Sequence, residues 1–138
     1  MIATLVIHVN LHVPVSKDEK RLLRTFAQVE SGNHNLPPYA DGYEQAWGLY
    51  GFHRGRWKEC APDGAEWGKA TPLQQDLAML KALRRYSRHC WRRGIPVTLN
   101  TIGRCHNGGP VINKPNAYTR RLAAAWKRVG GSNQKKGR

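Results

Sequence analysis

The sequence is organised around Val29-Glu30-Ser31-Gly32 and the segment that follows as far as Gly48-Leu49-Tyr50-Gly51-Phe52. Glu30 ends a run with the pattern of an amphipathic helix, and polar, turn-forming sequence follows at once. A carboxylate at the end of a packed helix lies partly against the core, and burial raises the pKa of a carboxyl group. A carboxylic acid still protonated near neutral pH is what cleavage of an acetal linkage needs. Asp41, eleven residues further on, is the candidate second carboxylate.

Helices are predicted on both sides of this stretch. Ser16 and Glu19 form a capping box before a helix that continues to about Val29. Thr71 and the proline after it begin the longest helix, which Gly94 ends. The remaining predicted helices are a short one over residues 98–106 and a last one that Asn116 caps and that ends at Gly130-Gly131. The residues expected on the buried side of the longest helix are Leu73, Leu77, Leu80, Tyr86, Cys90 and Trp91.

The rest of the sequence indicates a small β or loop region. Residues 5–15 alternate between apolar and polar side chains, which predicts a half-buried strand. Residues 31–47 have the composition of a loop, and residues 48–59 predict a short strand or turn and a short helix near Arg56–Cys60. We therefore expect a mostly helical α+β fold with a cleft beside a small β/loop lobe. The expected organisation is an N-terminal strand or extension (1–15), one domain (16–130) and a disordered basic tail (131–138).

Composition limits the classes of partner and cofactor. The formal net charge is +14 and the pI is about 10.4, so the surface attracts polyanions such as nucleic acid, anionic lipid or an acidic cell envelope. The three cysteines (60, 90 and 105) are too few for a disulfide framework, and the six histidines show no spacing typical of metal ligands. We expect no metal, no cofactor and no membrane span, and residues 1–15 lack the features of a secretory signal.

Three groups of residues together resemble the lysozyme superfamily. They are Val29-Glu30-Ser31-Gly32; Gly48-Leu49-Tyr50-Gly51-Phe52-His53 with Trp57; and Arg104-Cys105-His106-Asn107-Gly108-Gly109-Pro110 with Tyr118. Within this superfamily, the three groups of residues are most similar to invertebrate-type (destabilase-like) lysozymes and to bacterial or phage lytic-transglycosylase-type domains. The resemblance covers roughly residues 18–128.

The resemblance implies a lysozyme-like fold and a muramidase that cleaves the β-1,4 bond between N-acetylmuramic acid and N-acetylglucosamine. Glu30 is then the general acid, and Asp41 the nucleophile or electrostatic stabiliser; Glu44 and Glu59 are fallback second acids. Peptidoglycan strands are the implied partner of a monomer whose basic surface binds the anionic envelope. With no signal seen, such an enzyme is phage-released, virion-borne or exported by another route. The implied substrate-binding residues are Ser31, Gly48, Tyr50, His53, Trp57, His106, Asn107, Gly108, Gly109 and Tyr118.

Two features depart from the family, and three alternatives stay open. The family often has Gln at the position of Gly51, and its invertebrate-type members are rich in disulfides. The first alternative is a lytic transglycosylase that uses Glu30 alone. The second, of a different class, is a basic nucleic-acid-binding protein, although the basic residues are spread along the chain rather than grouped on a reading helix. The third is an inactive lysozyme-like domain that binds the cell wall.

Overall fold

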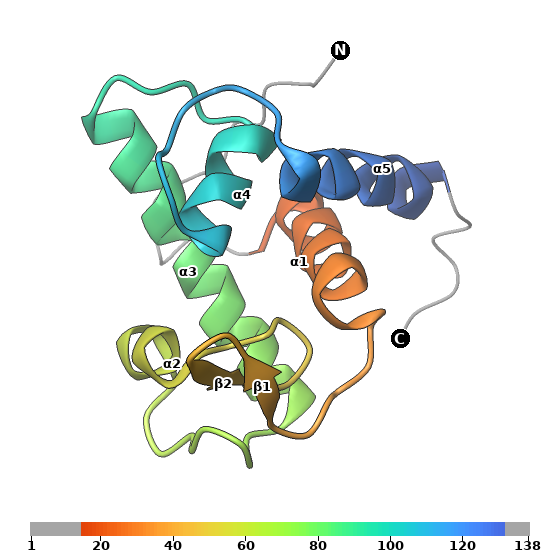
Figure 1. The fold of residues 1–138 in the computed structure, drawn as a ribbon, viewed down its shortest axis with the longest axis vertical. Coiled ribbons are helices and arrows are strands. Elements are labelled where there is room, and N and C mark those ends of the chain that lie inside the picture. Colours follow the sequence, from red (N-terminus) through yellow and green to blue (C-terminus); the bar gives the residue numbers. More distant parts are fainter. Residues whose placement is uncertain (1–14, 132–138) are drawn as a thin grey trace.

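The computed structural model describes residues 15–131, and within them the chain is mostly helical with one small antiparallel sheet (Figure 1). The predicted N-terminal strand and the basic tail lie, apart from Val15 and Gly131, outside the described residues. The coarse prediction of a helix-rich fold with a small β part is therefore confirmed. In chain order the elements are α1 (Lys17–Ser31), β1 (Tyr39–Asp41), β2 (Glu44–Ala46), α2 (Arg54–Cys60), α3 (Pro72–Arg92), α4 (Leu99–Asn107) and α5 (Ala117–Gly131).

Side-chain caps set the beginnings of the main helices, as predicted. The capping boxes at Ser16 and Thr71 are both formed, and the Asn116 side chain accepts a hydrogen bond from the Thr119 amide at 2.8 Å. Helix α1 ends later than predicted, because Gly32 adopts a left-handed φ of +64° just after Ser31. Glu30, which was expected to end this helix, therefore lies within the last turn of α1.

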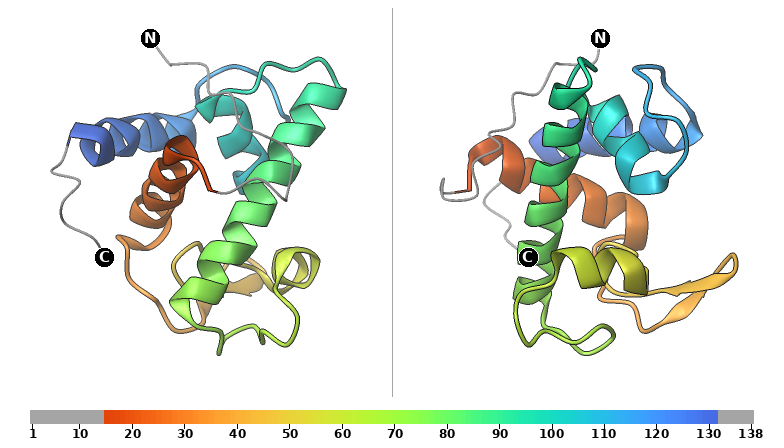
Figure 2. Two further views of the ribbon diagram at one scale, coloured as in Figure 1. Left: turned by 180° about the vertical axis from the view of Figure 1, so that it is seen from behind. Right: turned by 90° about the vertical axis from the view of Figure 1, so that its left-hand side faces the viewer.

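Helix α3 connects two parts of the molecule. In Figures 1 and 2, α1, α4 and α5 lie around one end of α3, and α2 and the β1–β2 hairpin lie at the other. Helix α5 packs on α1 and α4, and α3 contacts α1, α2 and α4. The core between these helices contains the fully buried side chains of Leu22, Phe26, Met79, Leu83, Ile102 and Leu122.

The buried side of α3 differs from the prediction. Leu73, Leu77 and Trp91 are exposed, and Leu73 and Leu77 line an apolar hollow with Val15. Leu80, Tyr86 and Cys90 are buried as predicted. The rest of the buried side is formed by Ala78, Met79, Ala82 and Leu83, which were not predicted. The prediction followed the largest apolar side chains, whereas small alanines let α3 approach its neighbours closely and so mark the packed face.

The hairpin was not expected within residues 31–47. Tyr39 pairs with Ala46 and Asp41 with Glu44, so a loop of two residues, Gly42 and Tyr43, connects the strands. Gly42 has φ +66°, the conformation that a two-residue hairpin loop with glycine first requires. The same Asp-Gly pair that indicated a loop therefore closes a hairpin. A separate antiparallel bridge joins Trp47 and Phe52.

A buried ion pair ties α1 to α3. The Arg84 guanidinium donates to Glu19 Oε2 at 2.6 Å and to Oε1 at 2.9 Å, and both side chains are almost completely buried. Glu19 Oε1 also accepts from the Ser16 amide in the capping box. The Glu19 carboxylate thus caps the beginning of α1 and also joins α1 to α3 through Arg84. No helix within residues 15–131 has the length and apolar character needed to cross a bilayer.

Candidate binding cleft

A cleft of about 350 Å³ lies where the end of α1, the hairpin, α2 and the end of α4 meet. Its walls are mostly polar or charged, and they include four carboxylates in a chain that is otherwise strongly basic. Glu30 and Asp41, which sequence reasoning paired, both line it. The lining residues are Glu30, Asp41, Glu44, Gly51, Phe52, His53, Gly55, Arg56, Glu59, His106 and Asn107.

Glu30 is held at the inner end of the cleft by a partner from α5. The Tyr118 hydroxyl donates a short hydrogen bond to Glu30 Oε2. Burial raises the pKa of the Glu30 carboxyl, and the nearby Asp41 raises it further. The hydrogen bond from Tyr118 and the charges of Arg121 and His53 lower this pKa but do not outweigh burial. The raised pKa expected from the position of Glu30 at a helix end is therefore present.

Gly51 leaves the room that Glu30 occupies. Its φ is +62°, and a Cβ at this position would lie 2.9 Å from Glu30 Oε1 and 3.2 Å from the Tyr39 hydroxyl oxygen. A side chain here would displace the carboxylate, since real Cβ contacts are longer than this. Gly51 thus shapes the cleft around Glu30.

The His53 side chain contacts one carboxylate from each strand of the hairpin, and all three side chains line the cleft. Its Nε2 lies 2.7 Å from Asp41 Oδ2, and its Nδ1 lies 2.7 Å from Glu44 Oε2. Burial lowers the pKa of His53, but the hydrogen bonds to Asp41 and Glu44 outweigh burial, so its pKa is raised. Both carboxylates are therefore engaged by one imidazolium when His53 is protonated.

The Asp41–His53–Glu44 contact is expected to open as the pH rises. Because the pKa of His53 is raised by folding, the contact is complete below the unfolded value of 6.5 and is lost as the pH rises through the higher folded value. An NMR titration of the His53 ring should show this raised pKa, and Asp41→Asn and Glu44→Gln should each lower it. An unchanged titration in both variants would contradict the assignment.

His106 is neutral at pH 7 and plays a structural part. Burial lowers its pKa to about 4, against the raising effect of its hydrogen bond to the Tyr50 carbonyl. Its Nε2 donates to that carbonyl at 3.2 Å, so its Nδ1, 2.9 Å from the Tyr86 hydroxyl oxygen, accepts from this hydroxyl. The 3.9 Å approach of His106 Nε2 to Glu30 is therefore not an ion pair at neutral pH.

Several residues predicted to bind a ligand lie in the core instead. Tyr50 is fully buried, and its hydroxyl bonds Asp76. Trp57 is buried, and its Nε1 donates to the Ala65 carbonyl at 3.0 Å. Gly48 is buried against Gln75, whereas Ser31 is half-buried and its hydroxyl donates to the Leu49 carbonyl at 2.8 Å. None of these residues is part of the lining of the cleft.

The turn after α4 is only partly in the cleft. Asn107 lines it, whereas Gly108 and Gly109 are exposed, have open space around them and are not part of the lining. Arg56, from α2, lines the cleft and was not predicted. Its signal in the sequence was weak, because one arginine among 23 basic residues does not stand out.

The described residues hold no group of three or more His, Cys, Asp or Glu side chains placed to bind a metal ion. Cys60, Cys90 and Cys105 are free thiols, and Cys90 Sγ lies 4.0 Å from Cys105 Sγ. Cys60 and Cys90 are buried as expected of small apolar side chains, and Cys105 is half-buried.

Comparison with known proteins gives one structural likeness. No protein-family model matches the chain, and no curated protein matches it. A chain of the crystal structure of Aeromonas hydrophila PliI in complex with Meretrix lusoria lysozyme matches with a TM-score of 0.56 and 23% identity. The match covers 87% of this chain and 92% of that one. At this identity the likeness shows a shared fold and is not evidence of any shared activity.

This finding corrects the activity predicted from the sequence. The matching crystal structure is one of PliI in complex with a lysozyme, and this comparison contradicts the predicted cleavage of peptidoglycan. Nothing in the comparisons is evidence of glycosidase activity. The predictions of a muramidase, of a lytic transglycosylase and of a bacteriolytic hydrolase are therefore withdrawn.

Proposed function

We propose that the chain has a lysozyme-like fold and binds a glycan strand of peptidoglycan in its cleft without cleaving it. The observation that supports this most directly is the engagement of Asp41 by His53 at 2.7 Å. Hydrolysis with two carboxylates needs the second one available to attack or to stabilise the sugar. The His53 imidazolium holds Asp41 and also contacts Glu44. An Asp41 carboxylate held in this way suits a fixed part of the cleft wall better than it suits a nucleophile.

The charge of the cleft favours a neutral ligand over a polyanion. Four carboxylates line it, whereas the basic residues in its described lining are Arg56, His53 and His106, of which His106 is neutral at pH 7. A phosphate backbone would meet repulsion here, and a sugar chain would not. Sugar hydroxyls and acetamido groups donate to carboxylates and accept from Asn107 and Arg56, so the lining offers the right partners.

The test is binding of purified peptidoglycan measured by co-sedimentation, with released fragments read by mass spectrometry. Wild type is expected to bind and to release neither hydrated nor anhydro sugar ends. Glu30→Gln should weaken binding by about tenfold, because it replaces one carboxyl oxygen with an NH₂ group that cannot accept a hydrogen bond. The matched control is Glu66→Gln on the surface, where the carboxylate lies 3.5 Å from Lys69, and it should bind as wild type does. Release of fragments by wild type but not by Glu30→Gln would overturn the proposal.

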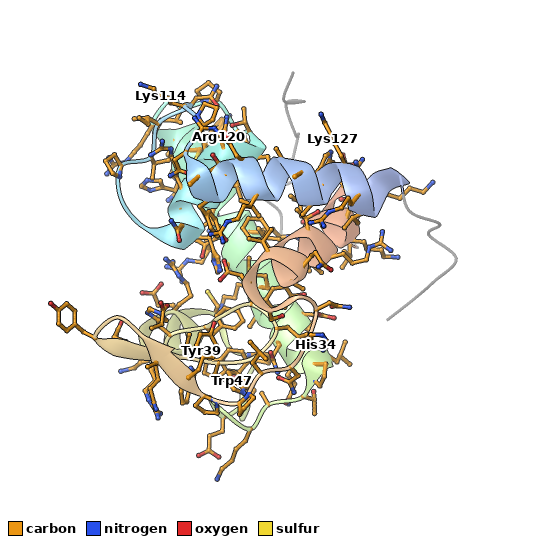
Figure 3. The ribbon with its side chains drawn as sticks, turned by 45° about the vertical axis from the view of Figure 1, so that its right-hand side comes forward. His34, Tyr39, Trp47, Lys114, Arg120 and Lys127 are labelled. Carbon is orange, nitrogen blue, oxygen red and sulfur yellow. The ribbon has the colours of Figure 1, made fainter. Side chains whose placement is uncertain are left out.

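A second candidate is favoured by the comparison, since the matching structure contains a complex with lysozyme. Tyr43, in the hairpin loop, is fully exposed, and the hairpin projects from the body of the molecule (Figure 3). Exposed aromatic side chains are enriched at protein interfaces. If the chain binds a lysozyme, an equimolar amount should slow that enzyme on cell walls, and Tyr43→Ser should relieve the effect. An unchanged rate at a large excess of wild type would exclude this candidate.

A further inference from the structure

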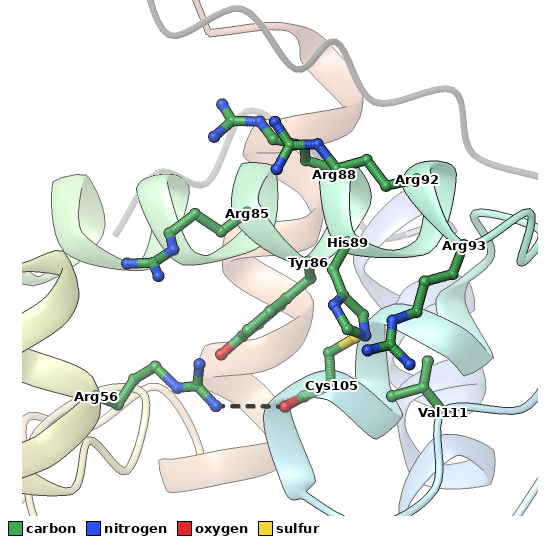
Figure 4. A pocket seen from close by; sticks show the side chains of 9 residues that line it. All are labelled: Arg56, Arg85, Tyr86, Arg88, His89, Arg92, Arg93, Cys105 and Val111. Carbon is green, nitrogen blue, oxygen red and sulfur yellow. Dashed lines mark hydrogen bonds between the residues drawn. The ribbon is translucent and has the colours of Figure 1, made fainter.

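A second cavity, of about 490 Å³, lies between α2, α3, α4 and the segment after α4 (Figure 4). None of the described residues that line it is acidic. Its charged side chains are those of five arginines, which we call the arginine pocket: Arg56, Arg85, Arg88, Arg92 and Arg93. From this grouping we propose that the pocket binds a polyol-phosphate chain, an anionic polymer with phosphate groups repeated along it.

The arginines come from more than one element, so helix stability alone does not account for them. Cations near the C-terminal end of a helix are favourable, which is a sufficient reason for Arg92 in the last turn of α3 and for Arg93 at its C-cap. Arg56 belongs to α2 and is directed to the pocket by a hydrogen bond to the Cys105 carbonyl at 3.4 Å. Its guanidinium lies 5.0 Å from the centre of the Tyr86 ring. The fold therefore brings a cation from a separate helix to this pocket.

The pocket keeps a large excess of positive charge. The carboxylate of Glu59 lies 3.8 Å from both Arg56 and Arg85, which is longer than a hydrogen bond. Because five arginines and no acidic residue are among the described lining residues, an anion is favoured there. Arginine presents paired N–H donors that match the oxygens of phosphate, so phosphate is the anion this lining fits best.

The length of the arginine row requires more than one phosphate. Arg85, Arg88 and Arg92 are spaced three and four residues apart on α3, and they extend over about 10 Å at 1.5 Å per residue. A single phosphate contacts only part of such a row. A chain with two or more phosphate groups contacts all of it.

The rings near the pocket favour a polyol chain over a nucleic acid. Proteins that bind single-stranded nucleic acid combine basic grooves with aromatic faces on which bases stack. Among the described lining residues the only Phe, Tyr or Trp is Tyr86, and it is 4% exposed. Trp91 is exposed but does not line the pocket. The pocket thus provides contacts for phosphate and no open phenol or indole face for a base.

The first experiment is isothermal titration calorimetry of the full chain with inorganic tripolyphosphate at fixed salt. The double variant Arg88→Gln/Arg92→Gln is expected to weaken binding by at least about tenfold. The matched control, Arg120→Gln/Arg128→Gln, removes the same charge from exposed positions on α5 and should stay within about twofold of wild type. Equal losses in the two double variants, or no binding by wild type, would overturn the proposal.

The second experiment separates the two kinds of phosphate polymer. Poly(glycerol phosphate) and a single-stranded oligonucleotide with the same number of phosphates are compared by the same titration. Tighter binding of the polyol polymer, lost in Arg88→Gln/Arg92→Gln, supports the proposal. An oligonucleotide that binds as tightly or more tightly would contradict it. Circular dichroism checks that each variant is folded before titration.

Discussion

Replacement of Arg84 by methionine is expected to lower the free energy of unfolding by about 3–5 kcal/mol. Arg84 donates to both oxygens of Glu19, and the two side chains are 3% and 1% exposed. Removing the guanidinium leaves a buried carboxylate without its cation, and an uncompensated buried charge is the costly result. Equilibrium unfolding in urea, followed by circular dichroism, measures the change.

Two further variants separate the loss of the ion pair from other causes. Arg120→Met, at an exposed position on α5, should change the free energy of unfolding by less than about 0.5 kcal/mol. Glu19→Gln/Arg84→Met removes the stranded charge and keeps a residue suited to the capping box, so it should be more stable than Arg84→Met alone. A double variant less stable than the single one would contradict this explanation.

The effect of Arg84→Met should also depend on pH. The hydrogen bonds from Arg84 and Ser16 and the charge of Arg84 outweigh burial and lower the pKa of Glu19 below 4.5. A lowered carboxyl pKa contributes stability above the unfolded value, and this stability is lost as the pH falls through the folded value. The difference between wild type and Arg84→Met should therefore shrink below about pH 4.5.

Gly48→Ala is expected to cost about 3–5 kcal/mol, combining a left-handed backbone with crowding. Gly48 has φ +82°, and a Cβ there would lie 2.2 Å from Gln75 Oε1. Gln75 has little room to move, because it accepts from the Leu49 amide at 2.8 Å and donates to Asn35 Oδ1 and the Ala70 carbonyl. The substitution therefore either strains the backbone or breaks these buried hydrogen bonds.

Gly42→Ala is the matched control for this prediction. Gly42 also has a left-handed φ, +66°, but no atom lies within 4 Å of a Cβ built on it. It should lose only the backbone contribution, about 1–2 kcal/mol. Thermal unfolding of the two variants compares them directly, and equal losses would show that crowding by Gln75 has no effect.

The helices and the position of Glu30 were predictable because their signals are local. Ser16 and Thr71 cap helices through residues three positions away, and the predicted helices are found close to their predicted bounds. The raised pKa of Glu30 also followed from its place at the end of a packed helix. The prediction that Leu73, Leu77 and Trp91 lie on the buried side of α3 was wrong. It relied on the spacing of large apolar side chains and gave too little weight to the alanines.

The sequence by itself determined where the main helices begin, that the chain is strongly basic and that Glu30 lies at the end of the first helix. These properties depend on hydrogen bonds and spacing within a few residues. The tertiary structure alone decided that His53 holds Asp41 and Glu44, that Arg84 pairs with Glu19 65 residues away and that arginines from α2 and α3 share one pocket. Such contacts join residues far apart in the sequence, and only the packing of the helices and the hairpin against each other brings them within reach.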